Sequence, residues 1–301
     1  MNHLFRIGLI IVAALLNACG PGSSGGEGTI TLSITDAPID GANKVVVNFI
    51  GVELRSSSLG VKQDFDFLVP VTLDLLDLQG INTALLLNGE TVEAGIYDEI
   101  RLKIHAAEDG MLESFIELPD GQHELIVPSG AESGLKIKND IEIPVDGDVS
   151  FTVDFSVRKS IVVAGGEGGS KVKYHLKPVL RIVEDIVAGH ITGLIDGSLL
   201  TAINCSESNP DTDNAVYVFT GPDVTPDDID TSSDDDVEPV VTALVDDSFS
   251  YTAAFLEPGE YTVAYTCNAN FEDIEFDDEL LFSTGKNVIV EAGKTSDGSL
   301  P

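Results

Sequence analysis

The stretch Thr29-Ile-Thr-Leu-Ser-Ile-Thr35 alternates polar and apolar residues with a period of two. Successive side chains of a β-strand point to opposite faces of a sheet, so this alternation predicts a half-buried strand. Glu99-Ile-Arg-Leu-Lys-Ile104, Val149-Ser-Phe-Thr-Val-Asp-Phe155 and, much later, Tyr261-Thr-Val-Ala-Tyr265 read as further strands, with Gly- and Asp-rich turns between the runs. The sequence therefore predicts an all-β protein of antiparallel β-sandwiches.

Charge divides the chain into two parts. The 301 residues include 16 Lys+Arg and 51 Asp+Glu, a formal net charge of −35, which excludes nucleic-acid binding through a general cationic surface. Residues 27–185 carry 13 Lys and Arg against 27 Asp and Glu, whereas residues 186–301 carry two Lys, no Arg and 24 Asp and Glu. We expect β-sandwich domains at 29–185 and 186–301, with at most one or two short helical turns near 73–87.

The N-terminus is typical of an exported protein. An apolar run of about ten residues, Ile7 to Leu16, has the length of a signal-peptide core and is too short to span a bilayer. The following Leu16-Asn17-Ala18-Cys19 resembles the lipobox of bacterial lipoproteins. This implies a signal peptide over 1–18, acylation of Cys19, a flexible tether over 19–28 and a place in the bacterial envelope. Gly20 in place of Asp favours the outer membrane. The alternative is an ordinary signal peptide with a chance cysteine.

Cys19 leaves two further cysteines, Cys205 and Cys267. In an oxidising compartment we expect them to form a disulfide, worth about 4 kcal/mol if unstrained. A two-cysteine metal site is the alternative, and it lacks nearby histidine ligands.

Two fragments share the pattern E-x-G-x-Y just before a predicted strand. They are Glu93-Ala-Gly-Ile-Tyr97 and Glu257-Pro-Gly-Glu-Tyr261. In β-sandwiches a tyrosine at such a corner often hydrogen-bonds to nearby backbone, so we expect structural corner tyrosines rather than a duplicated ligand site.

Catalytic motifs are weak. Ser156–Lys159 and Ser133–Lys136 match S-x-x-K, which in penicillin-recognising enzymes opens a helix. Ser156–Lys159 lies in a run that predicts a strand, where residues three apart point to opposite faces. Neither G-x-S-x-G nor H-E-x-x-H occurs.

Acidic loops of the second half offer hard oxygen ligands. The residues are Asp223, Asp227, Asp228, Asp230, Asp234, Asp235 and Asp236. They suit calcium, which takes six to eight oxygens, but the EF-hand spacing is absent. A solvated acidic surface is the favoured alternative, and no other cofactor is expected.

One basic cluster contrasts with this charge. It comprises Arg158, Lys159, Lys171, Lys173, Lys177 and Arg181. Strand alternation places Lys171, Lys173 and Lys177 on one face. The cluster could bind an anionic glycan or lipid headgroup, or dock the acidic second domain. Docking is favoured, because the second domain is on the same chain and is therefore always present at high effective concentration.

Two parts of the chain resemble known families, and these resemblances inform the fold. Leu32-Ser-Ile-Thr-Asp-Ala-Pro38, Gly95-Ile-Tyr97 and Phe155-Ser-Val-Arg-Lys-Ser-Ile161 resemble a bacterial domain of unknown function, DUF4382, over residues 29–183. That resemblance implies no established activity. Phe255-Leu-Glu-Pro-Gly-Glu-Tyr-Thr-Val263 resembles carboxypeptidase-regulatory or transthyretin-like modules of the carbohydrate-binding-like fold.

Together these features predict a non-enzymatic, lipid-anchored envelope protein that serves as a binding or structural module. One alternative is a carbohydrate-binding lipoprotein that uses its C-terminal domain, and another is a hydrolase with an unrecognised site. The expected partners are the membrane, through the lipid anchor, and a glycan or an envelope protein. The sequence leaves the oligomeric state open.

Overall fold

The computed structural model describes residues 25–37, 41–127, 134–165, 172–199, 214–230 and 237–301. Its described elements form five sheets, and its helical elements are one four-residue helix and short 3-10 turns. The predicted all-β class is confirmed. No helix among these residues is long and apolar enough to cross a bilayer.

Residues 25–185, here called the N-terminal half, contain fourteen strands. They are β1 (Glu27–Ala37), β2 (Lys44–Ser56), β3 (Val61–Asp74), β4 (Ala84–Glu93), β5 (Gly95–Tyr97), β6 (Glu99–His105), β7 (Phe115–Leu118), β8 (Gly121–Ile126), β9 (Leu135–Ile137), β10 (Ile141–Ile143), β11 (Asp148–Ser156), β12 (Ile161–Ala164), β13 (Lys173–Leu176) and β14 (Leu180–Glu184). One sheet has the order β14-β11-β1-β4, and a larger one has the order β12-β13-β8-β7-β2-β6-β9, with β3 paired to β2. β10 and β5 pair separately.

The core of this half is a single hydrophobic cluster to which both larger sheets contribute. Ile30, Leu32 and Ile34 of β1 are fully buried, as the period-two alternation requires. Phe49 of β2 and Phe155 of β11 belong to the same cluster. A 3-10 turn, η1 (Leu75–Leu78), follows β3 at the position where a short helical turn was expected.

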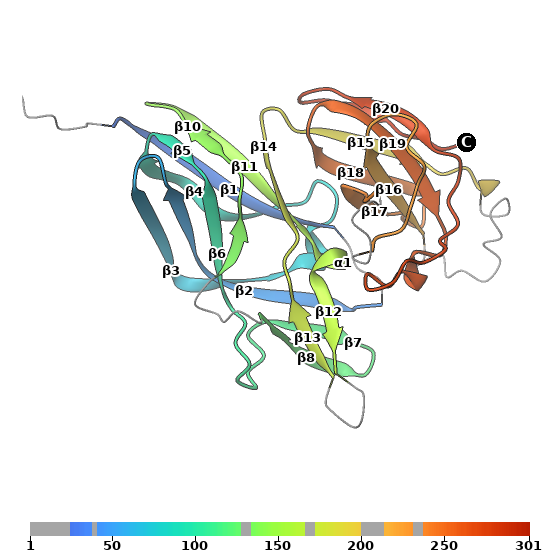
Figure 1. Cartoon of the computed structure of the whole chain (residues 1–301), viewed down its shortest axis with the longest axis horizontal. Helices are drawn as coiled ribbons and strands as arrows, with labels where there is room; N and C mark the ends of the chain where they lie inside the picture. The colour runs from blue at the N-terminus through green and yellow to red at the C-terminus, as the bar shows by residue number, and fades with distance from the viewer. Residues whose placement is uncertain (1–24, 38–40, 128–133, 166–171, 200–213, 231–236) are drawn as a thin grey trace, which may run out of the picture.

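Residues 186–301, the C-terminal half, form two further sheets. Their strands are β15 (Gly189–Leu194), β16 (Ala215–Thr220), β17 (Val241–Leu244), β18 (Ser250–Leu256), β19 (Gly259–Thr266), β20 (Lys286–Val290) and β21 (Thr295–Asp297), with a 3-10 turn η3 (Ala269–Phe271) after β19. The sheet orders are β18-β15-β21 and β17-β16-β19-β20. Figure 1 shows this half beside the N-terminal half, with the helix α1 (Val157–Ser160) at their junction.

The expectation of purely antiparallel sheets is wrong at three strand pairs. β1 runs parallel to β11, β8 to β13, and β15 to β21. Alternation along a strand reports which side chains are buried, but it carries no information about the direction of a neighbouring strand that is distant in sequence.

Strand β16 is buried on both of its faces. Val216 and Val218 point into the core between the two C-terminal sheets. Ala215, Tyr217 and Phe219 point to the opposite face and form a second cluster, against which Val162 of β12 packs. This second cluster therefore brings the C-terminal half into contact with the N-terminal half.

Both predicted corner tyrosines are confirmed. The Tyr97 hydroxyl donates to the Glu93 carbonyl at 2.9 Å, and the Tyr261 hydroxyl donates to the Glu257 carbonyl at 2.8 Å. In each case the tyrosine closes the turn four residues upstream.

Candidate functional site

The chain crosses from one sheet to the other at α1, which begins directly after β11 and ends directly before β12. The expectation of a strand through Ser156 to Lys159 is wrong, because the backbone is held in a turn. Asp36 Oδ1 accepts the Val157 N–H at 3.3 Å, and the Ser160 hydroxyl donates to the Ser156 carbonyl at 2.6 Å. The turn directs Arg158 and Lys159 toward the C-terminal half.

Arg158 makes the central contact between the halves. Its side chain is 5% exposed, and Nη1 donates to the Ala269 carbonyl at 2.9 Å. The same nitrogen lies 3.4 Å from the Tyr217 hydroxyl oxygen and 3.6 Å from a carboxylate oxygen of Glu272. A cation of the first half is thus buried in the second half, with an anion and two further oxygens around it.

Glu272 is the anion of this network, and its side chain is only 1% exposed. Its carboxylate accepts hydrogen bonds from the Tyr217 hydroxyl and from the Ile229 backbone N–H. Burial raises the pKa of Glu272 to about 7, against the lowering effect of nearby Arg158. Above that pH Glu272 is ionised, and breaking a buried ion pair by removing one partner typically costs about 3–5 kcal/mol, so the junction is then costly to open.

Two further cations of the predicted basic cluster reach the C-terminal half. The Lys159 ammonium donates to Glu238 Oε2 at 2.6 Å and to the Pro239 carbonyl at 2.8 Å. The Arg181 guanidinium donates to the Phe255 carbonyl and to Asp154. Arg158, Lys159 and Arg181 therefore all lie at the junction.

The other members of the cluster lie elsewhere. Lys173 pairs with Glu108 of its own half, and Lys177 is exposed between β13 and β14. Lys171 lies outside the described residues. The cluster is therefore divided between buried junction contacts and exposed positions, instead of presenting one common face.

The acidic residues proposed as calcium ligands have varied surroundings. Asp223 accepts from the Asn287 side-chain amide at 2.7 Å, and Asp228 accepts from the Asp278 N–H at 2.5 Å. Burial raises the pKa of Asp228 to about 6. The backbone N–H of Asp230 donates to Glu238. The described residues contain no group of three or more His, Cys, Asp or Glu arranged to hold a metal ion.

The remaining predicted acidic ligands and two cysteines cannot be placed, because they lie outside the described residues. They are Asp234, Asp235, Asp236, Cys19 and Cys205. Asp227 is described, and its carboxylate accepts the Asp228 backbone N–H at 3.1 Å. Cys267 is also described and is buried just after β19. Calcium binding and the disulfide therefore stay predictions.

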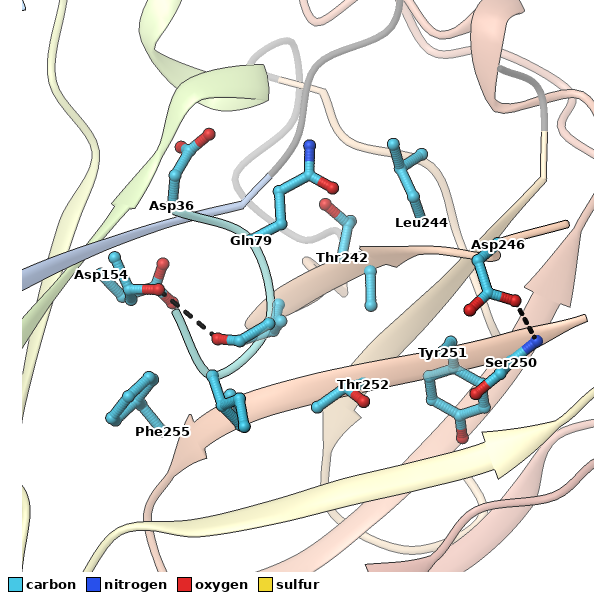
Figure 2. Close-up of a pocket in the computed structure, with 16 residues that line it drawn as sticks. Asp36, Gln79, Asp154, Thr242, Leu244, Asp246, Ser250, Tyr251, Thr252 and Phe255 are labelled. Atoms are coloured by element: carbon cyan, nitrogen blue, oxygen red, sulfur yellow. Dashed lines mark hydrogen bonds between the residues drawn. The ribbon is translucent and has the colours of Figure 1, made fainter. Parts of the chain in front are cut away.

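A pocket of about 250 Å³ lies along the junction. Figure 2 shows Asp36 and Gln79 of the N-terminal half on one wall and Thr242, Tyr251 and Thr252 of the C-terminal half on the other. Its volume is below the range of about 300–1,000 Å³ common for small-molecule sites. We interpret this pocket as a narrow seam between the halves.

The turn at Gly80 shapes one wall of this seam. Gly80 has φ +66°, a conformation that favours glycine, and a Cβ built there would lie 3.7 Å from Thr252 of β18. The carboxylates beside the seam already have partners: Asp154 pairs with Arg181, and Asp246 accepts the Ser250 N–H at 2.9 Å.

A family model described as a domain of unknown function, DUF4382, matches residues 27–178. The chain belongs to this family. The DUF4382 region includes α1 and therefore Arg158 and Lys159, whereas their partners Glu272 and Glu238 lie beyond it. β14, which pairs with β11 and completes the first sheet, also lies beyond the matched region.

Solved structures give only distant similarity. A minor pilin of Streptococcus agalactiae, GBS52, is 12% identical, with 90% of this chain and 94% of that chain covered and a TM-score of 0.22. A fimbrial protein of Bacteroides ovatus is 9% identical over 92% of this chain and 48% of that chain, with a TM-score of 0.21. The fimbrial anchor protein Mfa2 of Porphyromonas gingivalis is 12% identical, with 84% of this chain and 83% of that chain covered and a TM-score of 0.17. No curated protein matches the chain.

Sequence reasoning missed the junction partners of the DUF4382 region. Glu272 begins the acidic run that ends at Glu279, and nothing in the residue pattern separates it from its solvated neighbours. Tyr217 lies in a strand whose uninterrupted apolar run, Ala215-Val-Tyr-Val-Phe219, is typical of burial on both faces. This apolar run was the sequence signal that other residues cover the outer face of the strand.

Proposed function

We propose that this protein is a non-enzymatic structural module of the bacterial cell envelope, held to a membrane by acylation of Cys19. The observation that carries the structural role is the buried junction, in which Arg158 of the N-terminal half pairs with Glu272 of the C-terminal half. Such a junction fixes how the two halves are oriented, which suits a rigid module more than a hinged enzyme.

Calorimetry of the full chain tests the rigid-module proposal. We expect one unfolding transition whose van't Hoff and calorimetric enthalpies agree, because the junction couples the halves. Glu272→Ala leaves Arg158 without its anion and should split or broaden that transition. Glu279→Ala, which removes the same charge from an exposed position, is the matched control. Two separate transitions in the wild-type chain would refute the coupling.

The anchor is supported by the lipobox-like Leu16-Asn17-Ala18-Cys19 and by the Gly- and Ser-rich residues that follow it. Acyl chains contribute about 0.8 kcal/mol per buried methylene, so two or three chains hold a protein stably. Metabolic labelling with an alkyne fatty acid should modify the wild-type chain and a Ser23→Ala control but leave Cys19→Ala unlabelled. Label that persists in Cys19→Ala would exclude this anchor. Gly20 leads us to propose the outer membrane.

We also propose a division into domains at 29–185 and 186–301, the second being a transthyretin-like module with a Cys205–Cys267 disulfide. Separate hydrophobic clusters within the two ranges support this division. The two-sheet arrangement of the second range supports the module assignment. A hydrolase is less well supported, because the Lys159 ammonium is held by Glu238 and is poorly placed to act as a base for Ser156.

A further inference from the structure

The cations of this chain are distributed unevenly between paired and unpaired positions. Among the described residues, every Lys and Arg side chain but three lies within ion-pair distance of a carboxylate. The three exceptions are Lys136, Lys138 and Lys177, and all three are exposed. In a chain with 51 Asp and Glu, a cation without an anionic neighbour is unusual.

These exceptions gather at one groove. Lys136 and Lys138 line a groove of about 560 Å³, and Lys177 directly precedes Pro178 of the same lining. Arg181 also lines it, on the side of β14. The opposite wall comes from the C-terminal half, through Thr220, Val240, Glu257 and Tyr261, so the groove exists only when both halves are joined.

The lining combines four kinds of group: cations, neutral hydrogen-bonding side chains, apolar side chains and the single exposed carboxylate of Glu257 on the opposite wall. Its cations suit carboxylate or sulfate groups. Asn139 and Thr220 are neutral hydrogen-bonding residues whose side chains are exposed. Val179, which is exposed, and the partly buried Leu180 supply apolar surface. A uronic-acid saccharide presents the matching set of a carboxylate, hydroxyl groups and apolar C–H faces, and the groove volume lies within the usual range for small-ligand sites.

We propose that this groove binds an acidic, uronate-containing saccharide, with Lys136 and Lys138 contacting its carboxylates. An acidic peptide is the competing ligand, because its carboxylates would suit the same cations, and the poly-glutamate arm of the test below distinguishes it. The competing structural explanation is that the lysines protect β9, an edge strand of the large sheet, from pairing with other chains. That explanation requires no ligand.

Calorimetric titration of the full chain with an oligogalacturonate tests the proposal at low ionic strength. We expect binding that weakens as salt is added, because exposed charges are screened. Lys136→Gln combined with Lys138→Gln should weaken binding about tenfold, the effect of losing two exposed charge pairs. The matched control combines Lys44→Gln with Lys294→Gln, which removes the same charge from exposed lysines elsewhere.

The outcomes separate the explanations. Binding that is lost in the groove variant, is kept in the control and is absent for a neutral galactose oligomer supports the proposal. No binding to the wild-type chain overturns it and leaves edge protection as the role of the lysines. Equal losses in both variants, or equal affinity for poly-glutamate, also overturn it, because the attraction would then be unspecific or directed to acidic peptides. The proposed envelope role is tested separately and does not depend on this result.

Discussion

Replacing Glu272 with glutamine tests whether the buried carboxylate makes stability depend on pH. Burial raises its pKa from an ordinary value of 4.5 to about 7, so the folded chain binds this proton more tightly than the unfolded chain does. A raised acid pKa stabilises the fold below the unfolded value, and that stabilisation disappears as pH rises through the folded value. The wild-type chain should therefore lose stability from this group as pH rises from about 4.5 to about 7.

The magnitude follows from the two pKa values. At about 1.36 kcal/mol per pKa unit, linkage gives a loss of about 2.5 kcal/mol between about pH 5 and pH 8. In Glu272→Gln the side chain does not titrate, and its single amide oxygen can still accept the Ile229 N–H, while the NH2 group takes the place of the oxygen that faced the Tyr217 hydroxyl. The variant should lack this part of the pH dependence. Any stability that it loses because a neutral amide faces Arg158 is the same at both pH values.

Urea unfolding followed by circular dichroism at both pH values measures the effect. The free energy of unfolding of the wild type minus that of the variant should fall by about 2.5 kcal/mol from about pH 5 to about pH 8. Asp228 and His190 titrate in both proteins, so their contributions cancel in this difference. A difference that stays constant, or that rises with pH, would show that Glu272 is ionised throughout and that Arg158 outweighs its burial.

Further predictions concern the corner, the core and the surface charge. Tyr261→Phe should cost about 1 kcal/mol in urea unfolding, because the Glu257 carbonyl loses its donor; an unchanged midpoint would contradict the corner role. Phe155→Ala should cost about 3–5 kcal/mol, since this fully buried side chain lies in the N-terminal core, and a cost below 1 kcal/mol would mean that the site collapses. The melting temperature should rise with added salt, because the acidic C-terminal half repels itself; equal values at low and high salt would refute this. Melts in calcium and magnesium at matched ionic strength should agree if the acidic loops are only solvated, whereas a rise specific to calcium would indicate a site.

Local patterns predicted the features that depend on one strand at a time. Alternation in Thr29–Thr35 placed Ile30, Leu32 and Ile34 in the core, and the repeated E-x-G-x-Y pattern predicted two corner hydrogen bonds that are present. These outcomes follow from side-chain geometry within a few residues, which the sequence displays directly.

Features that depend on distant pairing were not predictable in the same way. The parallel neighbours β1 and β11 are separated by more than a hundred residues, and nothing in the sequence of either strand indicates whether they pair parallel or antiparallel. The alternating types around Ser156 resemble a strand, but the distant carboxylate of Asp36 accepts the Val157 N–H and favours a turn. Glu272 is buried because Arg158 meets it, and the acidic run around it gave no sign of that partner.

The doubly covered strand β16 has a consequence for how the chain is made. Its outer residues Tyr217 and Phe219 pack with Val162, which belongs to an earlier part of the chain and so emerges first during synthesis and export. The N-terminal half can therefore act as a template that is already in place when the later strands arrive. Produced alone, residues 186–301 would present uncovered aromatic surface and a buried carboxylate without its arginine. We therefore expect that fragment to aggregate, and its solubility to be restored by co-production with the first half.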